Sequence, residues 1–201
     1  LGSIDFNKII PMPESLKIEC GSNTDKGLKA FTDFTQVYTL AGTREDADIE
    51  NIPKEAEKAF LRIRSDITPE QRSLGKIAYE NQSKYGVPTW YEWSINNWGT
   101  KWNAYECAPN EFSDNSTELN FWTAWAPPHP VLQMLSEQYP ELEIFHKWAD
   151  EDIGMNCGQR EYKSGDLIYE YYPEGDEATA FACELWRLDP SEETDSPVME
   201  M

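Results

Sequence analysis

The first half of the chain places its hydrophobic residues mainly at helical spacing. Apolar positions three and four residues apart predict helices over Asp25–Leu40, Pro53–Ile63 and Pro69–Tyr85. Two of these begin with proline in the first turn, and Gly86 follows the last, where a left-handed residue ends a helix. The opening segment Phe6–Leu16 is apolar but holds two prolines, so we expect it to be extended.

In the second half the pattern changes to alternation, which is typical of strands. Turn residues at Ser113–Thr117 and Lys163–Asp166 separate pairs of strands, and prolines bound the intervening helix. The expected strands are Trp102–Ala108, Leu119–Trp125, Leu142–Trp148 and Leu167–Tyr172, and the expected helices are Val131–Tyr139 and Glu177–Leu188.

These elements predict an α+β fold in which a mainly helical N-terminal part is packed with an antiparallel sheet. Strand, strand, helix, strand, strand, helix is the order expected of a split βαβ, ferredoxin-like sheet with its helices on one face. The predicted domains are 1–88, a helical region, and 89–188, the ferredoxin-like domain. An acidic tail, 189–201, follows, and the two main parts could form one compact unit.

The stretch Thr89–Glu106 contains four of the eight tryptophans. Thr89 and Glu92 have capping-box spacing, so a short helix is predicted from Trp90, ending before Gly99. Large aromatic side chains are core residues or stacking platforms, and both interpretations stay open. As core residues, Trp98 and Trp102 would join helix to sheet, and alanine at either would lower stability by several kcal/mol. As a binding site, the stretch offers Trp90, Trp93, Asn97, Trp98, Trp102 and Asn103.

Charge is unevenly distributed along the chain. Residues 1–102 carry 13 Lys and Arg against 15 Asp and Glu, a net charge of −2, whereas residues 103–201 carry 4 against 22, a net charge of −18. A surface this negative repels phosphate backbones, so we expect no direct nucleic-acid binding. It is either a solvated face or a surface for a basic protein partner.

Several other classes of protein are disfavoured. No run of about eighteen apolar residues is present, and the first residues lack the features of a signal peptide, so we expect a cytoplasmic protein without membrane contact. The four cysteines lie far apart without metal-ligand spacing, and buried reduced thiols are expected instead. We therefore expect no cofactor.

Candidate catalytic groups are few. His129 lies between prolines, and His146 alternates with apolar neighbours in a predicted strand, which favours a hydrogen-bonded, partly buried side chain. Neither histidine has a nucleophile at a motif spacing. A weak metal site, and with it a metal-dependent hydrolase, would use His146, Asp150, Glu151 and Asp152.

Three segments, FNKIIPMPESL (Phe6–Leu16), NWGTKWNA (Asn97–Ala104) and FWTAWAPPHPVLQMLSEQYPELEI (Phe121–Ile144), resemble signature blocks of the YubB-like family. This is a family of plasmid- and phage-encoded bacterial proteins with a C-terminal ferredoxin-like domain. The resemblance implies that fold and a mobile-element or phage context, and it supplies no catalytic residues.

Three functions from different classes remain, and we rank them in this order. The first is a non-enzymatic interaction protein whose acidic C-terminal half binds a basic partner. The second is a small-ligand or carbohydrate-binding domain that uses the tryptophan-rich stretch. The third is the metal-dependent hydrolase.

Overall fold

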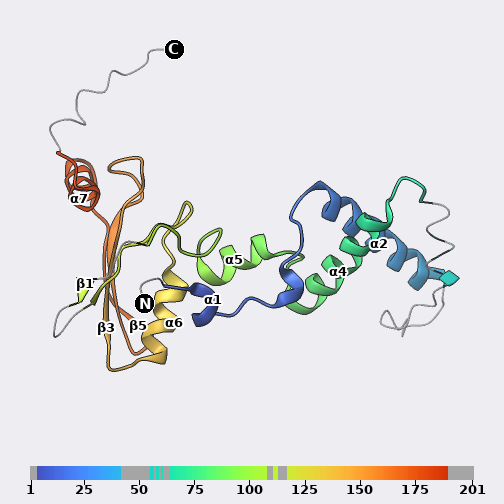
Figure 1. Cartoon of the computed structure of the whole chain (residues 1–201), viewed down its shortest axis with the longest axis horizontal. Coiled ribbons are helices and arrows are strands. Elements are labelled where there is room, and N and C mark those ends of the chain that lie inside the picture. The colour runs from blue at the N-terminus through green and yellow to red at the C-terminus, as the bar shows by residue number, and fades with distance from the viewer. Residues whose placement is uncertain are drawn as a thin grey trace, which may run out of the picture. The chain divides into compact units, whose positions relative to one another are not determined.

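The computed structural model describes residues 4–41, 55–56, 58, 60, 64–107, 111–112 and 117–189. It separates into two compact units (Figure 1). One unit is Met12–Trp93, and the other combines Leu1–Pro11 with Ser94–Met201. The division falls inside helix α5, Trp90–Trp98, which is the short helix predicted from the capping-box spacing. Thr89 Oγ1 caps it by accepting from Tyr91 N at 3.4 Å and donating to Glu92 at 2.8 Å.

The unit Met12–Trp93 is helical. Its elements are the 3-10 turn η1, Glu14–Leu16, and the long helices α2, Ser22–Ala41, and α4, Pro69–Tyr85. Helix α4 has the predicted bounds because its ends carry local signals. Thr68 and Gln71 form a capping box, and Gly86 closes the helix with φ of 78°. The predicted helix Pro53–Ile63 lies mostly outside the described residues.

Helices α2 and α4 touch through their backbones. A Cβ built on Gly27 would lie 1.8 Å from the carbonyl oxygen of Gln71, and one on Gly75 would lie 2.1 Å from the Gly27 carbonyl group. The aromatic rings of Phe31 and Tyr79 pack beside this crossing, with centroids 5.2 Å apart. Only glycine allows so close an approach.

Gly75→Ala should therefore destabilise this unit by about 1–3 kcal/mol, because the added methyl group meets main-chain atoms that cannot rotate away. At a helical position with open space around it, replacing glycine with alanine would raise stability, since alanine is the better helix former by about 1 kcal/mol. Urea unfolding followed by circular dichroism measures the difference. Gly21→Ala is the control, because its Cβ would meet only the flexible end of Glu19. Equal stability of the two variants would contradict the close crossing.

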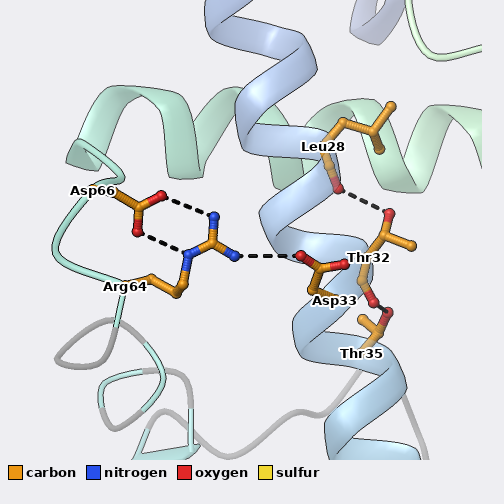
Figure 2. Close-up of polar contacts among 6 residues, drawn as sticks. All are labelled: Leu28, Thr32, Asp33, Thr35, Arg64 and Asp66. Carbon is orange, nitrogen blue, oxygen red and sulfur yellow. Dashed lines mark hydrogen bonds and ion pairs between the residues drawn. The ribbon is translucent and has the colours of Figure 1, made fainter.

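An ion-pair network holds the segment before α4 against α2 (Figure 2). Arg64 donates from Nε and Nη2 to the two carboxylate oxygens of Asp66, at 2.8 and 3.0 Å, and from Nη1 to Asp33 at 3.3 Å. This forked contact lowers the pKa of Asp66 and raises that of Arg64. On α2, Thr32 donates back to the Leu28 carbonyl, as Figure 2 shows. Arg64 is half-buried and both carboxylates are exposed, so the network orients the segment more than it stabilises the unit.

The other unit contains a three-stranded antiparallel sheet in the order β3–β4–β5. The strands are Glu143–Trp148, Gly158–Lys163 and Asp166–Tyr171. Ser164 and Gly165, both with positive φ, make the predicted hairpin turn between β4 and β5. Together with the helices, this sheet makes the fold α+β, as predicted.

Two helices contact residues on opposite sides of the sheet. Helix α6, His129–Gln138, lies against the face that carries His146. Helix α7, Asp176–Trp186, places Phe181 against Lys147 and Tyr171 on the other face. The expectation that the helices share one face is therefore wrong, because strand alternation sends neighbouring residues of β3 to different helices.

Two predicted strands are also wrong. In place of Trp102–Ala108 and Leu119–Trp125, the structure has one isolated bridge, Tyr105↔Trp122, and the two-residue strands β1, Glu111–Phe112, and β2, Thr117–Glu118. Glu106 has φ of 46° and Trp125 has φ of 69°, and a left-handed residue breaks an extended strand. The alternation here belongs to irregular segments.

The opening segment is not extended either. It forms a helical turn, α1, Phe6–Ile9, because the side chain of Asp5 accepts from Asn7 N and caps it. Its prolines come after the turn, where they do not interrupt it.

Among the cysteines, Cys157 and Cys183 are buried as predicted, while Cys20 is exposed. No helix in the described part of the chain is long and apolar enough to cross a membrane. Residues 190–201, most of the predicted tail, lie outside the described residues.

Candidate functional site

A groove of about 450 Å³ lies beside the sheet in the unit that contains β3. Its walls come from the segments around the Tyr105↔Trp122 bridge, from the end of β3 and the loop after it, and from the end of α7. The aromatic residues that line it are Trp102, Tyr105, Phe121, Trp122, Trp125, Trp148 and Trp186. Ligand sites are commonly concave and aromatic in this way, with a few polar groups among the rings.

Side-chain hydrogen bonds hold the groove loop, residues 123–126, in place. Thr100 Oγ1 donates to the Ala124 carbonyl at 2.8 Å, and Thr123 Oγ1 donates to that of Ala126 at 2.9 Å. Asn156 donates to the Trp125 carbonyl at 3.3 Å. The left-handed backbone of Trp125 costs about 1 kcal/mol or more, and these bonds maintain it.

Trp102 and Trp125 form what we call the aromatic clamp. The ammonium of Lys101 lies 4.5 Å from the ring centroid of Trp102 and 4.3 Å from that of Trp125. Both indoles are open to solvent, with exposed fractions of 44% and 66%. An ammonium over two aromatic faces is a cation–π arrangement, in which the ring quadrupoles attract the charge.

The groove has an acidic end, formed by Asp150 and Glu151. The two carboxylate oxygens of Asp150 accept from Asp152 N at 3.1 Å and from Asn156 Nδ2 at 3.3 Å, and its carbonyl accepts from Trp186 Nε1 at 2.9 Å. These bonds tie together the acidic loop, the groove loop and α7. The groove therefore offers a ligand both aromatic faces and negative charge.

A half-buried aromatic cluster adjoins the groove, between α6 and the sheet. The rings of His146 and Trp148 stack with centroids 5.2 Å apart, and His129 packs edge-on against both. Burial is the main cause that lowers the pKa of His146 to about 3 and that of His129 to about 4, and the charge of the nearby Arg160 guanidinium contributes to both values. His129 also contributes to the lowered pKa of His146. Tyr162 Oη lies 3.1 Å from His129 Nδ1. Both histidines are therefore neutral at pH 7.

His146 was expected to be partly buried and hydrogen-bonded, and the structure differs in the second respect. It is partly buried, but its Nδ1 atom has no hydrogen-bond partner among the described residues, and neither does Trp148 Nε1. His146, Asp150 and Glu151 line the same groove, whereas Asp152 does not. Within the described residues, no three His, Cys, Asp or Glu side chains gather as a metal site would require. The metal-dependent hydrolase stays a prediction without further support.

The predicted ligand residues are dispersed. Of the six, Trp102 alone lines the groove. Trp93 and Trp98 are buried, and Trp90 and Asn97 are half-buried. Asn103 is used structurally, since its side chain accepts from Phe6 N at 2.8 Å and donates to Asp5 at 2.7 Å.

Sequence reasoning missed Trp122, Trp125, Trp148 and Trp186 as groove residues. One signal could have found Trp125. It precedes Ala126 and two prolines, and such a segment is more typical of a loop than of a strand.

One comparison with known proteins gives the fold class of this part. A family model described as the ferredoxin-like domain in Api92-like protein matches residues 98–194, a range that contains every residue lining the groove. A crystal structure of protein api92 from Yersinia pseudotuberculosis is similar to the chain at 14% identity and a TM-score of 0.40. The similarity covers 79% of this chain and 74% of that one. No curated protein matches. The predicted ferredoxin-like class is confirmed, with an Api92-like description.

Proposed function

We propose that this α+β chain, whose residues 98–194 match a ferredoxin-like domain, is a cytoplasmic, non-enzymatic binding protein whose acidic C-terminal half engages a basic partner in the aromatic groove. One observation carries the proposal: a lysine ammonium lies against two solvent-open indoles at the groove, within 4.5 Å of both ring centroids. The origin from a mobile element or phage stays part of this proposal, supported by the three sequence blocks that resemble the YubB-like family.

Charge supports the choice of partner. Residues 103–201 carry −18 of the total charge of −20, and all groove residues belong to that half except Trp102. A negative field of this size attracts a cationic partner over long range and raises its association rate. Asp150 and Glu151 then place two acids at the groove itself. The long-range field and the acids at the groove therefore both favour a basic partner.

Trp125→Ala should weaken binding of a basic segment by about fivefold or more, as expected when a central tryptophan of an interface is truncated. The binding probe is an end-blocked decalysine peptide, titrated against the full chain at low and at physiological salt and followed by fluorescence anisotropy. Binding of the unmodified protein should weaken with salt, because exposed charges are screened.

Phe145→Ala is the matched control. Phe145 is 65% exposed, close to the value for Trp125, but it alternates with His146 on β3 and points to the opposite face of the sheet. This variant should bind decalysine as the unmodified protein does. Absence of decalysine binding, or equal losses in the two variants, would contradict the proposal.

A carbohydrate or other small neutral ligand is the second candidate, because Trp102 of the predicted platform lines the groove beside other exposed indoles. Sugars stack on such faces without needing charge. Oligosaccharide binding that depends on Trp125 and is insensitive to salt, with no decalysine binding, would favour this candidate over the basic partner.

A further inference from the structure

We propose that the aromatic clamp is the subsite for one lysine ammonium of the partner, and that Lys101 occupies it in the free protein until the partner's lysine displaces it. The inference rests on the proposed function and deepens it, since it names the group that is recognised and the event that accompanies binding.

The first step is the geometry around the occupant. The Lys101 ammonium lies within 4.5 Å of both clamp centroids, well inside the distance of about 6 Å at which a cation is attracted to a ring face. Both rings stay open to solvent, so a second cation can reach them. The ammonium of a lysine sits on a flexible four-carbon stem, which gives it other rotamers outside the clamp.

The second step is preorganisation. Trp125 gains little from burial, because 66% of the residue is exposed, yet its backbone is held in a strained left-handed conformation. Bonds at Ala124, Trp125 and Ala126 carbonyls keep the loop in this shape. A loop fixed before binding loses less entropy when a ligand arrives, which is what a recognition element needs.

The third step is how sequence assembles the clamp. Lys101 and Trp102 come from the NWGTKWNA block and Trp125 from the FWTAW block. Gly99 allows the two blocks to meet, because a Cβ there would lie 2.9 Å from the Pro130 ring and 3.2 Å from the Pro127 carbonyl oxygen. Two tryptophan-containing blocks that are distant in the sequence thus converge on one cation.

The choice of lysine follows from the charges nearby. The charged residues that line the groove are two acids, Asp150 and Glu151, and one base, Lys147. Their sum is negative, so the groove attracts a cationic side chain more than an anionic one. The occupant that the structure shows is an ammonium, and methyl groups on such an ammonium keep its charge while weakening its hydration. A trimethylated lysine should accordingly bind the clamp more tightly than lysine does.

The decisive variant is Lys101→Met, which removes the ammonium from the clamp while keeping a side chain of similar length. Its affinity for decalysine should rise by about two- to fivefold, the fold-change expected when one exposed cation–π competitor is removed. Lys147→Met is the matched control, because Lys147 also lines the groove and lies over an aromatic ring, that of Phe181, yet does not enter the clamp. It removes the same charge and should raise affinity less than twofold. Melting temperatures of both variants establish that they fold.

A second arm tests the need for charge at the clamp. N-acetyl-trimethyllysine methylamide should quench the fluorescence of the Lys101→Met variant, whereas its uncharged tert-butyl isostere should not. Equal gains in decalysine affinity in Lys101→Met and Lys147→Met would overturn this inference, and so would equal binding of the two small compounds. The proposed function would still stand if decalysine binds and the binding depends on Trp125. No decalysine binding by any variant would overturn both.

Discussion

Trp98→Ala is expected to lower the free energy of unfolding by about 3–5 kcal/mol, the range found for large buried aromatic residues. Trp98 is only 5% exposed. Its ring packs edge to face on Phe6 with centroids 6.1 Å apart, and its Nε1 donates to the Ile10 carbonyl at 2.9 Å. The substitution removes the packing, leaves a cavity and takes away the donor that pairs with the Ile10 carbonyl.

Trp102→Ala is the comparison that makes this result specific. The sequence predicted a large stability loss at both positions, but Trp102 is 44% exposed and lines the groove. Its truncation should change stability by less than about 1 kcal/mol, as for most surface substitutions. Urea titration of both variants measures the difference. A loss at Trp102 as large as that at Trp98 would show that Trp102 supports the core after all.

Acidification should destabilise the protein through His146, by about 3–4 kcal/mol between pH 6.5 and pH 3.5. The folded protein holds the pKa of His146 at about 3, chiefly by burial, while the unfolded chain titrates at its ordinary value of 6.5. Between these values the unfolded state binds a proton that the folded state does not. Stability is therefore complete above pH 6.5 and is lost as the pH falls toward 3.

The pH profile of His146→Phe isolates this contribution from those of other groups. Phenylalanine keeps a ring stacked on Trp148 and removes a buried nitrogen that has no partner among the described residues, so stability at pH 7 should be unchanged or higher. Against pH, the variant should lose less stability than the unmodified protein. Relief of repulsion among the acids acts on both proteins alike. Parallel curves for the two proteins would contradict the assignment.

Local signals decided which elements could be predicted from sequence. Helix α4 has the predicted bounds because Thr68, Pro69 and Gly86 mark its ends within a few residues. Strand β3 was found because its side chains alternate between exposed and half-buried positions. Strand β5, which is exposed along almost its whole length, was found from the turn residues that precede it. Alternation failed at Trp102–Ala108 because exposed aromatic residues on irregular segments can also occupy every second position. Periodicity records sequence spacing and not hydrogen bonding.

The groove was mostly invisible to sequence reasoning for a different reason. Lys101 and Trp125 are 24 residues apart, and no local pattern brings them together. What places them is a set of tertiary contacts, such as the bond from Thr100 Oγ1 to the Ala124 carbonyl. The tryptophan count correctly drew attention to the region, but it could not separate buried Trp98 from exposed Trp102.

The glycine contact between α2 and α4 has an evolutionary consequence. Gly27 and Gly75 each exclude a side chain because of the other helix's main chain, and no substitution elsewhere can trim a main chain. Where two side chains pack together, one can become smaller when the other becomes larger. Here an added side chain at one glycine meets main-chain atoms, so no substitution at the other glycine makes room for it. The two glycines lie 48 residues apart in the sequence, and a side chain at either one can be accommodated only if the two helices move apart.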